Sequence, residues 1–364
     1  MKIAFVFDKF MYGGIERVGI NHIKILREMG HEVDAYVLSR KNEDMINELK
    51  TLCSVKIVPF SDRFCPDIYW KITRRFKIGK YIFSSVYLFF KIILFLIKPF
   101  KKQKKKYDVA IAFSGHIADL TFVAYNLIKA DKRACWLHGA LFTYVTESQG
   151  FETLYKRIIN LAVLSEDSQH EVIAQHLKDG FAEFNIQKIY NAVDTVHEEI
   201  NQTNVEELKR KYGNFILMVA RCHYPHKDQY TAIKAVQILK EKYSIQRKLV
   251  LLGDGPERNK LEQFVKDRNC EDIVVFEGTK NNVQDYYSAA SILVHASIFG
   301  EGLPTILIEA MNFGIPVIST DTKTGPHEII GDNKYGFLCD IQDAEGMAEK
   351  LHILLSDNEV YRCY

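Results

Sequence analysis

The chain has 364 residues, the length of two domains of ordinary size. Its formal net charge is only +2, so no global excess of positive charge points to nucleic acid. Seven scattered cysteines without a C-x-x-C pair indicate a reducing compartment rather than a disulfide framework. The apolar run before Asp8 is too short for a secretory signal peptide, so we expect a cytoplasmic protein.

The chain begins with an alternation of strand and helix. Ile3–Phe7 and Val33–Leu38 predict strands, and a helix begins between them near Ile15. Gly13 and Gly14 precede this helix, where a phosphate or a sugar can approach the backbone. An ordinary turn needs the same residues, and the pair is not the G-x-G-x-x-G dinucleotide fingerprint. Further strands are expected over residues 108–113, 133–137 and 160–164.

Residues 71–106 differ in composition from the rest of the chain. An aromatic and aliphatic helix is expected there, with basic runs on both sides. Ser84, Lys91 and Lys98 are spaced seven apart and form one narrow polar stripe. Three placements fit such a helix: it crosses a membrane, packs in the core with a solvated edge, or lies in the membrane interface. The central lysine disfavours crossing, and the basic flanks favour an interfacial helix on anionic lipid.

After a charged, helix-bearing linker over residues 201–213, the same order of elements starts again. Phe215–Ala220 predicts a strand, and a loop with Arg221 and Lys227 follows it. A helix over 229–240 and a strand over 248–252 come next. The repeated order indicates two Rossmann-like halves. Taken alone, the two loop cations would be ordinary solvated residues.

Residues 291–330 predict a further strand, loop, helix and strand. Ile292–Ala296 is the first strand, and the helix runs from Pro304 to about Asn312. The loop before the helix is rich in small residues. Its backbone N–H groups and the positive end of the helix dipole would attract an anion. Glu301 and Glu309 lie eight residues apart in this unit, so both can face one ligand.

The pattern S-x-F-G-E-G-L-P-x-x-x-x-E-A-M-x-x-G-x-P-V-I within 291–330 resembles the E-x7-E signature of retaining GT-B glycosyltransferases. The resemblance is to family 4 in particular, the glycosyl transferases group 1. GGIERV at 13–18 and the W-x-H context of His138 fit this family. KIYNAVD at 188–194 fits it too, with Ala192 at a position where glycine is usual.

The resemblance implies an α/β GT-B fold, in which two Rossmann-like domains face each other across a cleft. Residues 1–195 would form the acceptor-binding domain, with 71–106 facing the membrane, and 196–364 would bind the nucleotide-sugar.

The same resemblance implies the roles of individual residues. Arg221 and Lys227 would clamp the diphosphate, Glu309 would bind the ribose, and Glu301 would hold sugar hydroxyls. The implied catalytic residues are Glu301, His138, Arg221 and Lys227. The implied donor-binding residues are Gly13, Gly14, Arg221, Lys227, Asn282, Val283, Gly302, Leu303, Pro304, Thr305 and Glu309.

We therefore expect a retaining glycosyltransferase that moves a sugar from a nucleotide-sugar to a membrane-linked or saccharide acceptor. We expect the donor to be a UDP-sugar. The product would be a cell-surface polysaccharide, O-antigen or capsule, made at the inner face of the plasma membrane. No cofactor is expected, and no metal, because the sequence has no D-x-D motif. A UDP-N-acetylglucosamine 2-epimerase-like GT-B enzyme would turn over its nucleotide-sugar without an acceptor. A non-catalytic membrane-docked scaffold would not hydrolyse a donor.

Overall fold

The computed structural model divides the chain into two compact units, Met1–Ala192 and Val193–Tyr364. The sequence analysis placed the boundary after residue 195 instead. Asp194, in the segment expected to close the first domain, lies outside the described residues. The structure describes residues 1–10, 13–40, 42–69, 73, 76–96, 105–139, 154–155, 157–170, 172, 184–193, 200–299, 301–322 and 324–364.

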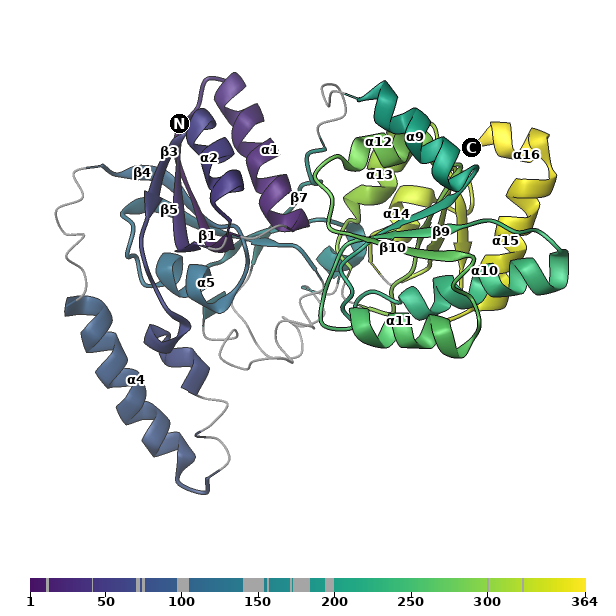
Figure 1. The fold of residues 1–364 in the computed structure, drawn as a ribbon. Coiled ribbons are helices and arrows are strands. Elements are labelled where there is room, and N and C mark those ends of the chain that lie inside the picture. The colour runs from purple at the N-terminus through teal and green to yellow at the C-terminus, as the bar shows by residue number, and fades with distance from the viewer. Residues whose placement is uncertain are drawn as a thin grey trace. The chain divides into compact units, whose positions relative to one another are not determined.

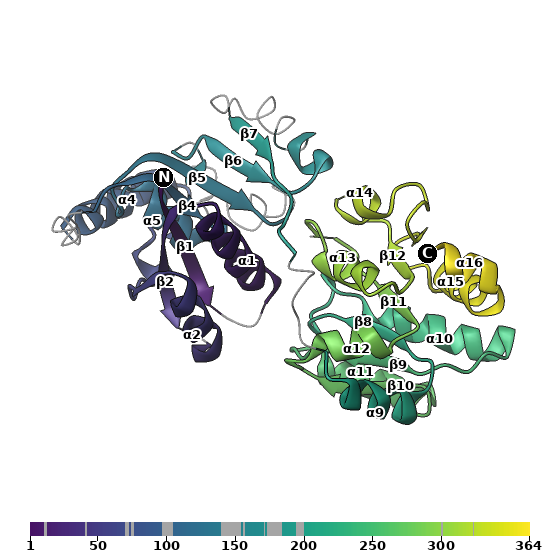
Figure 2. The same cartoon turned by 90° about the horizontal axis from the view of Figure 1, so that it is seen from above.

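The described residues of the first unit form a seven-stranded parallel sheet in the order β3-β2-β1-β4-β5-β6-β7. Figure 2 shows this order from β2 to β7. β1 lies between β2 and β4, so the chain moves outward to β3 and then returns to the other side of β1. This reversal makes a crevice at the carboxyl ends of β1 and β4, the position where such sheets bind ligands. The strands are β1 (Lys2–Phe10), β2 (Glu32–Arg40), β3 (Ser54–Ile57), β4 (Tyr107–Ala112), β5 (Ala130–Leu137), β6 (Asn160–Val163) and β7 (Asn185–Lys188).

Helices pack against both the sheet and one another in this unit. Its longer helices are α1 (Gly14–Glu28), α2 (Glu43–Leu52), α4 (Gly79–Leu96) and α5 (Ile117–Ala124), with short 3-10 turns η1 (Asp62–Phe64) and η2 (Pro66–Tyr69). The Asn42 side chain caps α2 by accepting a hydrogen bond from the Met45 N–H at 3.2 Å. The Ser165 hydroxyl oxygen accepts a hydrogen bond from the Ser168 N–H at 3.2 Å, as expected of a helix cap.

Helix α4 stands away from the sheet in Figure 1 and contacts η2, where Tyr69 and Phe90 stack with ring centroids 4.8 Å apart. Among its described apolar side chains, only that of Leu94 is buried. Ser84 and Lys91 are exposed, as the polar stripe predicts, and Lys98 lies outside the described residues. The exposed apolar surface does not fit a core helix. No helix among the described residues combines the length and apolarity needed to cross a membrane.

The described residues of the second unit form a six-stranded parallel sheet in the order β10-β9-β8-β11-β12-β13. The first strand is again central, so the crevice lies at the carboxyl ends of β8 and β11. The strands are β8 (Ile216–Val219), β9 (Leu249–Leu252), β10 (Val274–Gly278), β11 (Ile292–His295), β12 (Val317–Thr320) and β13 (Phe337–Cys339). Two Rossmann-like units are therefore confirmed.

Alternate side chains of the second sheet bury against helices on opposite faces. Met218 packs in the cluster with α10 and α15, whereas Leu217 packs in the cluster with α9, α12 and α13. The helices are α9 (Gln202–Tyr212), α10 (Gln229–Tyr243), α11 (Arg258–Asp267), α12 (Val283–Ala289), α13 (Thr305–Asn312), α14 (Pro326–Ile330), α15 (Ala344–Ser356) and α16 (Asn358–Cys363). Pro304, expected in the first turn of α13, is its N-cap instead, because its carbonyl accepts the first hydrogen bond, from Leu307 N–H at 3.1 Å.

Candidate functional site

The loop between β11 and α13 carries Glu301 and is fixed by a later segment of the chain. The Thr324 hydroxyl donates a hydrogen bond to the backbone oxygen of Glu301. Gly325 has a φ of 89° and lies so close to Gly302 that a Cβ atom there would overlap the Gly302 carbonyl oxygen. Only glycine satisfies both the positive φ and the close approach. The sequence analysis assigned no role to Thr324 or Gly325.

Glu301 forms a buried ion pair with Lys227, which lies in the loop after β8. The Lys227 Nζ atom is 2.5 Å from Glu301 Oε1 and 3.3 Å from His295 Nε2. His295 ends β11, is fully buried, and lies 3.5 Å from the same carboxylate oxygen. Burial by itself would raise the pKa of Glu301, but the Lys227 ammonium outweighs it and holds that pKa well below its usual range. The carboxylate is therefore ionised at neutral pH.

Hydrogen bonds from β12 determine which nitrogen of His295 carries its proton. The Ser319 hydroxyl donates to the Thr320 carbonyl at 3.0 Å, so its oxygen is left to accept from His295 Nδ1–H, also at 3.0 Å. Burial, with the nearby Lys227 ammonium, lowers the pKa of His295, which stays neutral. Its Nε2 is then an acceptor for Lys227. The sequence analysis missed His295, because it lies within an apolar strand.

Glu309 lies half-buried on α13, on the helix that the Glu301 loop begins. The Tyr287 hydroxyl of α12 donates a hydrogen bond to its Oε2 atom at 2.9 Å. Gly302, Leu303 and Pro304 are buried, and Thr305 opens the helix. The structure therefore brings the expected anion-binding backbone and the two expected carboxylates onto one segment.

The other expected donor-binding residues lie at the same edge of the second sheet. Arg221 follows β8 and is exposed, and its guanidinium forms no hydrogen bond or ion pair within the described part of the chain. Its backbone oxygen accepts a hydrogen bond from Gln229 Nε2 at 2.9 Å. Asn282 is the N-cap of α12 and donates from its side chain to Asp285 at 2.9 Å, and Val283 opens the helix. These contacts fix the backbone of both loops.

Three expected site residues belong to the first unit. Gly13 is the N-cap of α1, and Gly14 is its first residue. His138 follows β5 and donates from Nε2 to the Phe113 carbonyl at 2.7 Å, which leaves Nδ1 as its acceptor. Burial lowers the pKa of His138 to about 3, so the ring stays neutral. Near its partner Phe113, Asp8 and His116 form a pair at 3.2 Å that the sequence analysis did not assign. The sequence feature that could have indicated this pair was the loop Ser114-Gly115-His116, which follows the strand expected over 108–113.

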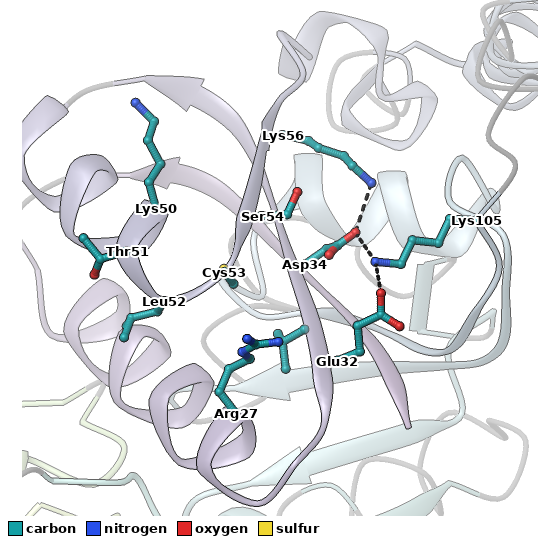
Figure 3. A pocket seen from close by; sticks show the side chains of 11 residues that line it. Arg27, Glu32, Asp34, Lys50, Thr51, Leu52, Cys53, Ser54, Lys56 and Lys105 are labelled. Atoms are coloured by element: carbon teal, nitrogen blue, oxygen red, sulfur yellow. Dashed lines mark hydrogen bonds and ion pairs between the residues drawn. The ribbon is translucent and has the colours of Figure 1, made fainter.

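A pocket of about 650 Å³ lies at the amino end of the first sheet, opposite the edge that carries Asp8 and His138. Figure 3 shows Lys56 and Lys105 both reaching the buried carboxylate of Asp34, at 3.0 and 2.8 Å. The Tyr107 hydroxyl also donates to Asp34, at 2.5 Å. This cluster joins β2, β3 and the residues that lead into β4. Its contacts indicate a structural role.

Replacing Asp34 by asparagine should lower the free energy of unfolding at pH 7 by about 2 kcal/mol, because two lysines lose a buried counter-ion. Burial by itself would raise the pKa of Asp34, but hydrogen bonds from Lys105, Tyr107 and Lys56 outweigh it and lower that pKa. This stabilisation is present above the unfolded pKa of about 3.9 and is lost as pH falls through the folded pKa. Denaturant titrations at several pH values measure this difference in the free energy of unfolding.

Glu48→Gln, which breaks an exposed pair with Arg17, is the control and should change stability by less than about 1 kcal/mol. A pH-independent difference between wild type and Asp34→Asn would contradict the prediction.

No group of three or more metal-ligating His, Cys, Asp or Glu side chains gathers among the described residues. That no metal is required remains a prediction from the sequence.

Comparisons with known proteins agree with this geometry. The sequence profile of the glycosyl transferases group 1 family matches residues 199–363. The N-acetylgalactosamine-N,N'-diacetylbacillosaminyl-diphospho-undecaprenol 4-alpha-N-acetylgalactosaminyltransferase of Campylobacter jejuni is 32% identical over 176 residues, which are 48% of this chain and 46% of that protein. The amylovoran biosynthesis glycosyltransferase AmsD of Erwinia amylovora is 28% identical over 268 residues, 73% of each chain.

Solved structures share the whole fold. Anabaena Alr3699/HepE in complex with UDP-glucose has a TM-score of 0.74 at 19% identity, covering 100% of this chain and 92% of that one. WaaG, a glycosyltransferase involved in lipopolysaccharide biosynthesis, has a TM-score of 0.68 at 17% identity, with 99% and 92% covered. The fold is therefore that of the GT-B glycosyltransferases. Residues 199–363 match the glycosyl transferases group 1, a family of transferase enzymes. The chain spans about half the length of the Campylobacter relative.

Proposed function

We propose that this enzyme transfers a sugar from a UDP-sugar to a saccharide or lipid-linked acceptor during polysaccharide synthesis. The observation that carries the proposal is the Lys227–Glu301 pair beside the start of α13, with Glu309 on the same helix. A cation, the backbone N–H groups of a helix N-terminus and two carboxylates suit a ligand that joins a diphosphate to hydroxyl-rich rings. The relatives support it: AmsD is named for amylovoran biosynthesis, the Campylobacter protein for an undecaprenol-linked sugar, and HepE binds UDP-glucose.

The proposed chemistry uses positioned charge rather than a proton donor on the second unit. As the bond between the anomeric carbon and the diphosphate breaks, negative charge grows on the leaving group. Lys227, Arg221 and the N-terminus of α13 stabilise that charge. Glu301 is ionised, so it accepts hydrogen bonds from sugar hydroxyls and does not act as an acid. We propose the retaining outcome and membership of family 4 on the E-x7-E resemblance.

The deciding experiment is a panel of nucleotide-sugars tested with the purified protein by thermal shift and by release of UDP. Stabilisation by a UDP-sugar and acceptor-dependent release of UDP are expected. No binding of any nucleotide-sugar would contradict the proposed function. Epimerisation of UDP-N-acetylglucosamine without an acceptor would identify the epimerase alternative.

We propose further that residues 71–106 attach the enzyme to the inner face of the plasma membrane. The support is the exposed apolar surface of α4, where Tyr81, Leu88, Phe89 and Ile92 are 79%, 58%, 59% and 50% exposed. Exposed apolar surface of this kind suits insertion at the level of the headgroups. The basic run 101–106 adds attraction to anionic lipid.

Binding to anionic vesicles should weaken in high salt without vanishing, because salt screens the lysines but not the apolar contact. Lys105 pairs with Glu32 and Asp34, and Lys106 with Asp131, so the charge variant should spare both. Replacing Lys101, Lys102 and Lys104 by glutamine should weaken binding by about a hundredfold, at about 1 kcal/mol per lysine. Their structure lies outside the described residues.

Sedimentation with vesicles measures this binding. Leu88→Ser with Phe89→Ser should remove the salt-resistant part. Ile341→Ser, at an exposed apolar position of the second unit, is the control. Equal binding to neutral and anionic vesicles, or binding to neither, would contradict the interfacial attachment.

A further inference from the structure

Another pocket, of about 480 Å³, lies between α4 and the rest of the first unit. One wall is formed by the second half of α4, with Leu88, Lys91, Ile92 and Leu94. The other wall comes from the end of α5, from β5 and from the segment before β6, with Ala124, Tyr125, Asn126, Arg133 and Arg157. All of these residues belong to the first unit, so the pocket needs nothing from the second.

Three cations line this pocket, and no carboxylate does so among the described residues. Lys91 is exposed and forms no hydrogen bond or ion pair within the described part of the chain. Arg133 donates from Nη1 to the Ala124 carbonyl at 3.0 Å, and its other N–H groups find no partner within those same residues. The pocket therefore carries an excess of positive charge, unlike the amino-end pocket, where carboxylates pair with the lysines.

The third cation, Arg157, is held in place by two tyrosines. Its Nη2 atom donates to the Tyr87 hydroxyl at 2.7 Å, and its guanidinium lies 4.7 Å from the centroid of the Tyr125 ring, within the range of a cation–π contact. The Tyr125 hydroxyl also donates to that of Tyr87, at 2.8 Å. These contacts join α4 to the end of α5 and fix the guanidinium before any ligand arrives, which lowers the entropic cost of binding.

The apolar side of the pocket continues into the exposed surface of α4. Leu88 and Ile92 line the pocket and are still 58% and 50% exposed. Their spacing from Lys91 places all three on one face of the helix. A ligand with its charged group at the cations can therefore extend an apolar chain along α4. A small anion without a chain would leave this apolar surface in water, so the pocket suits an anionic amphiphile better.

We propose that this pocket binds the phosphate group of an anionic membrane phospholipid, with the acyl chains beside Leu88 and Ile92. The inference rests on the proposed attachment of α4 to the membrane and adds a specific headgroup site to it. Guanidinium groups match phosphate oxygens in pairs, and the Lys91 ammonium supplies a further point charge. Lys91, the central residue of the polar stripe, thereby binds the headgroup and is more than a solvated edge.

The test uses short-chain lipids below the concentration at which they form micelles, so that binding needs no membrane surface. A phosphorus NMR titration with the whole protein measures the Kd of dihexanoylphosphatidylglycerol. Dihexanoylphosphatidylcholine has the same chains, but its choline neutralises the phosphate. The phosphatidylglycerol should bind roughly tenfold more tightly or better, because only its charge is unbalanced. Equal affinity for the two lipids would overturn the inference.

Variants separate the contribution of the headgroup from that of the chains. Lys91→Gln should weaken binding of the phosphatidylglycerol roughly fivefold and leave the phosphatidylcholine almost unchanged. Adding Arg133→Gln should remove the preference between the lipids. Ile92→Ser should weaken both lipids by a similar factor, because it removes a contact with the chains. Lys132→Gln is the matched control: this exposed lysine lies next to Arg133 on the opposite face of β5, and its loss should change neither affinity. Thermal unfolding confirms that each variant is folded.

Two results would assign the charge or the pocket differently. Equal weakening by Lys91→Gln and Lys132→Gln would indicate general attraction to a basic surface and overturn the pocket site. Tighter binding of inorganic phosphate, or of geranyl diphosphate as a short isoprenyl lipid, would overturn the phospholipid as the ligand. These outcomes are distinct from failure of the proposed attachment, because that failure would appear as wild-type protein that does not sediment with anionic vesicles.

Discussion

Replacing Lys227 by alanine should lower kcat/KM by roughly a hundredfold or more. The ammonium would act on charge that grows on the leaving diphosphate, so its loss falls mainly on the transition state. The variant also leaves Glu301 buried without its main counter-ion, since Lys227 is the group 2.5 Å from its carboxylate. Steady-state kinetics with the preferred donor measure the loss. Arg221→Ala should show an effect of similar size.

Controls separate the two roles of Lys227. Lys240→Ala on α10 removes only an exposed pair with Asp272 and should leave turnover unchanged. If Lys227 acts only by orienting Glu301, the double variant with Glu301→Gln should be no slower than either single variant. If Lys227 also acts on the diphosphate, the double variant should be slower than both. Near wild-type turnover in folded Lys227→Ala and Arg221→Ala would place the diphosphate clamp elsewhere.

Glu309→Ala should weaken UDP binding by about 1.5–3 kcal/mol, the loss of charge-assisted hydrogen bonds to the ribose hydroxyls. This corresponds to roughly a tenfold to hundredfold rise in Kd. Calorimetry with UDP measures it without any need for an acceptor. Tyr287→Phe is the informative companion variant, because its hydroxyl orients Oε2 of Glu309. It should weaken binding by a smaller amount. An unchanged Kd for Glu309→Ala would remove the carboxylate from the ribose site.

Much of the fold could be predicted from the sequence because both sheets are built from short apolar strands at regular spacing. The expected strand over 292–296 is β11, and the expected helix over 229–240 is α10. The position of Glu309 in a helix two turns beyond Glu301 followed from spacing alone. The sequence analysis assigned no element to residues 40–70, which hold α2 and β3 as well as two 3-10 turns.

The contacts within the site could not be predicted, because they depend on strand order. Lys227 and Glu301 lie 74 residues apart and meet only because β8 and β11 are neighbours in the sheet. The sequence analysis assigned Lys227 to the diphosphate and Glu301 to the sugar. The amino-end cluster is similar: Lys105 belongs to a basic run that reads as solvated, yet it bonds the buried Asp34. The sequence of a charged run does not indicate which of its lysines forms an ion pair in the fold.

The pairing of Lys227 leaves it with little freedom toward a ligand. An ammonium has three N–H donors, and here two of them are directed at His295 and Glu301. One donor remains, so Lys227 can donate a hydrogen bond to a single oxygen of a diphosphate. Arg221, exposed and with five donors in a planar fork, can span two oxygens at once. Lys227 would then position the diphosphate through one hydrogen bond, while Arg221 binds it through two. A lysine at position 221 would keep the positive charge and lose the paired hydrogen bonds.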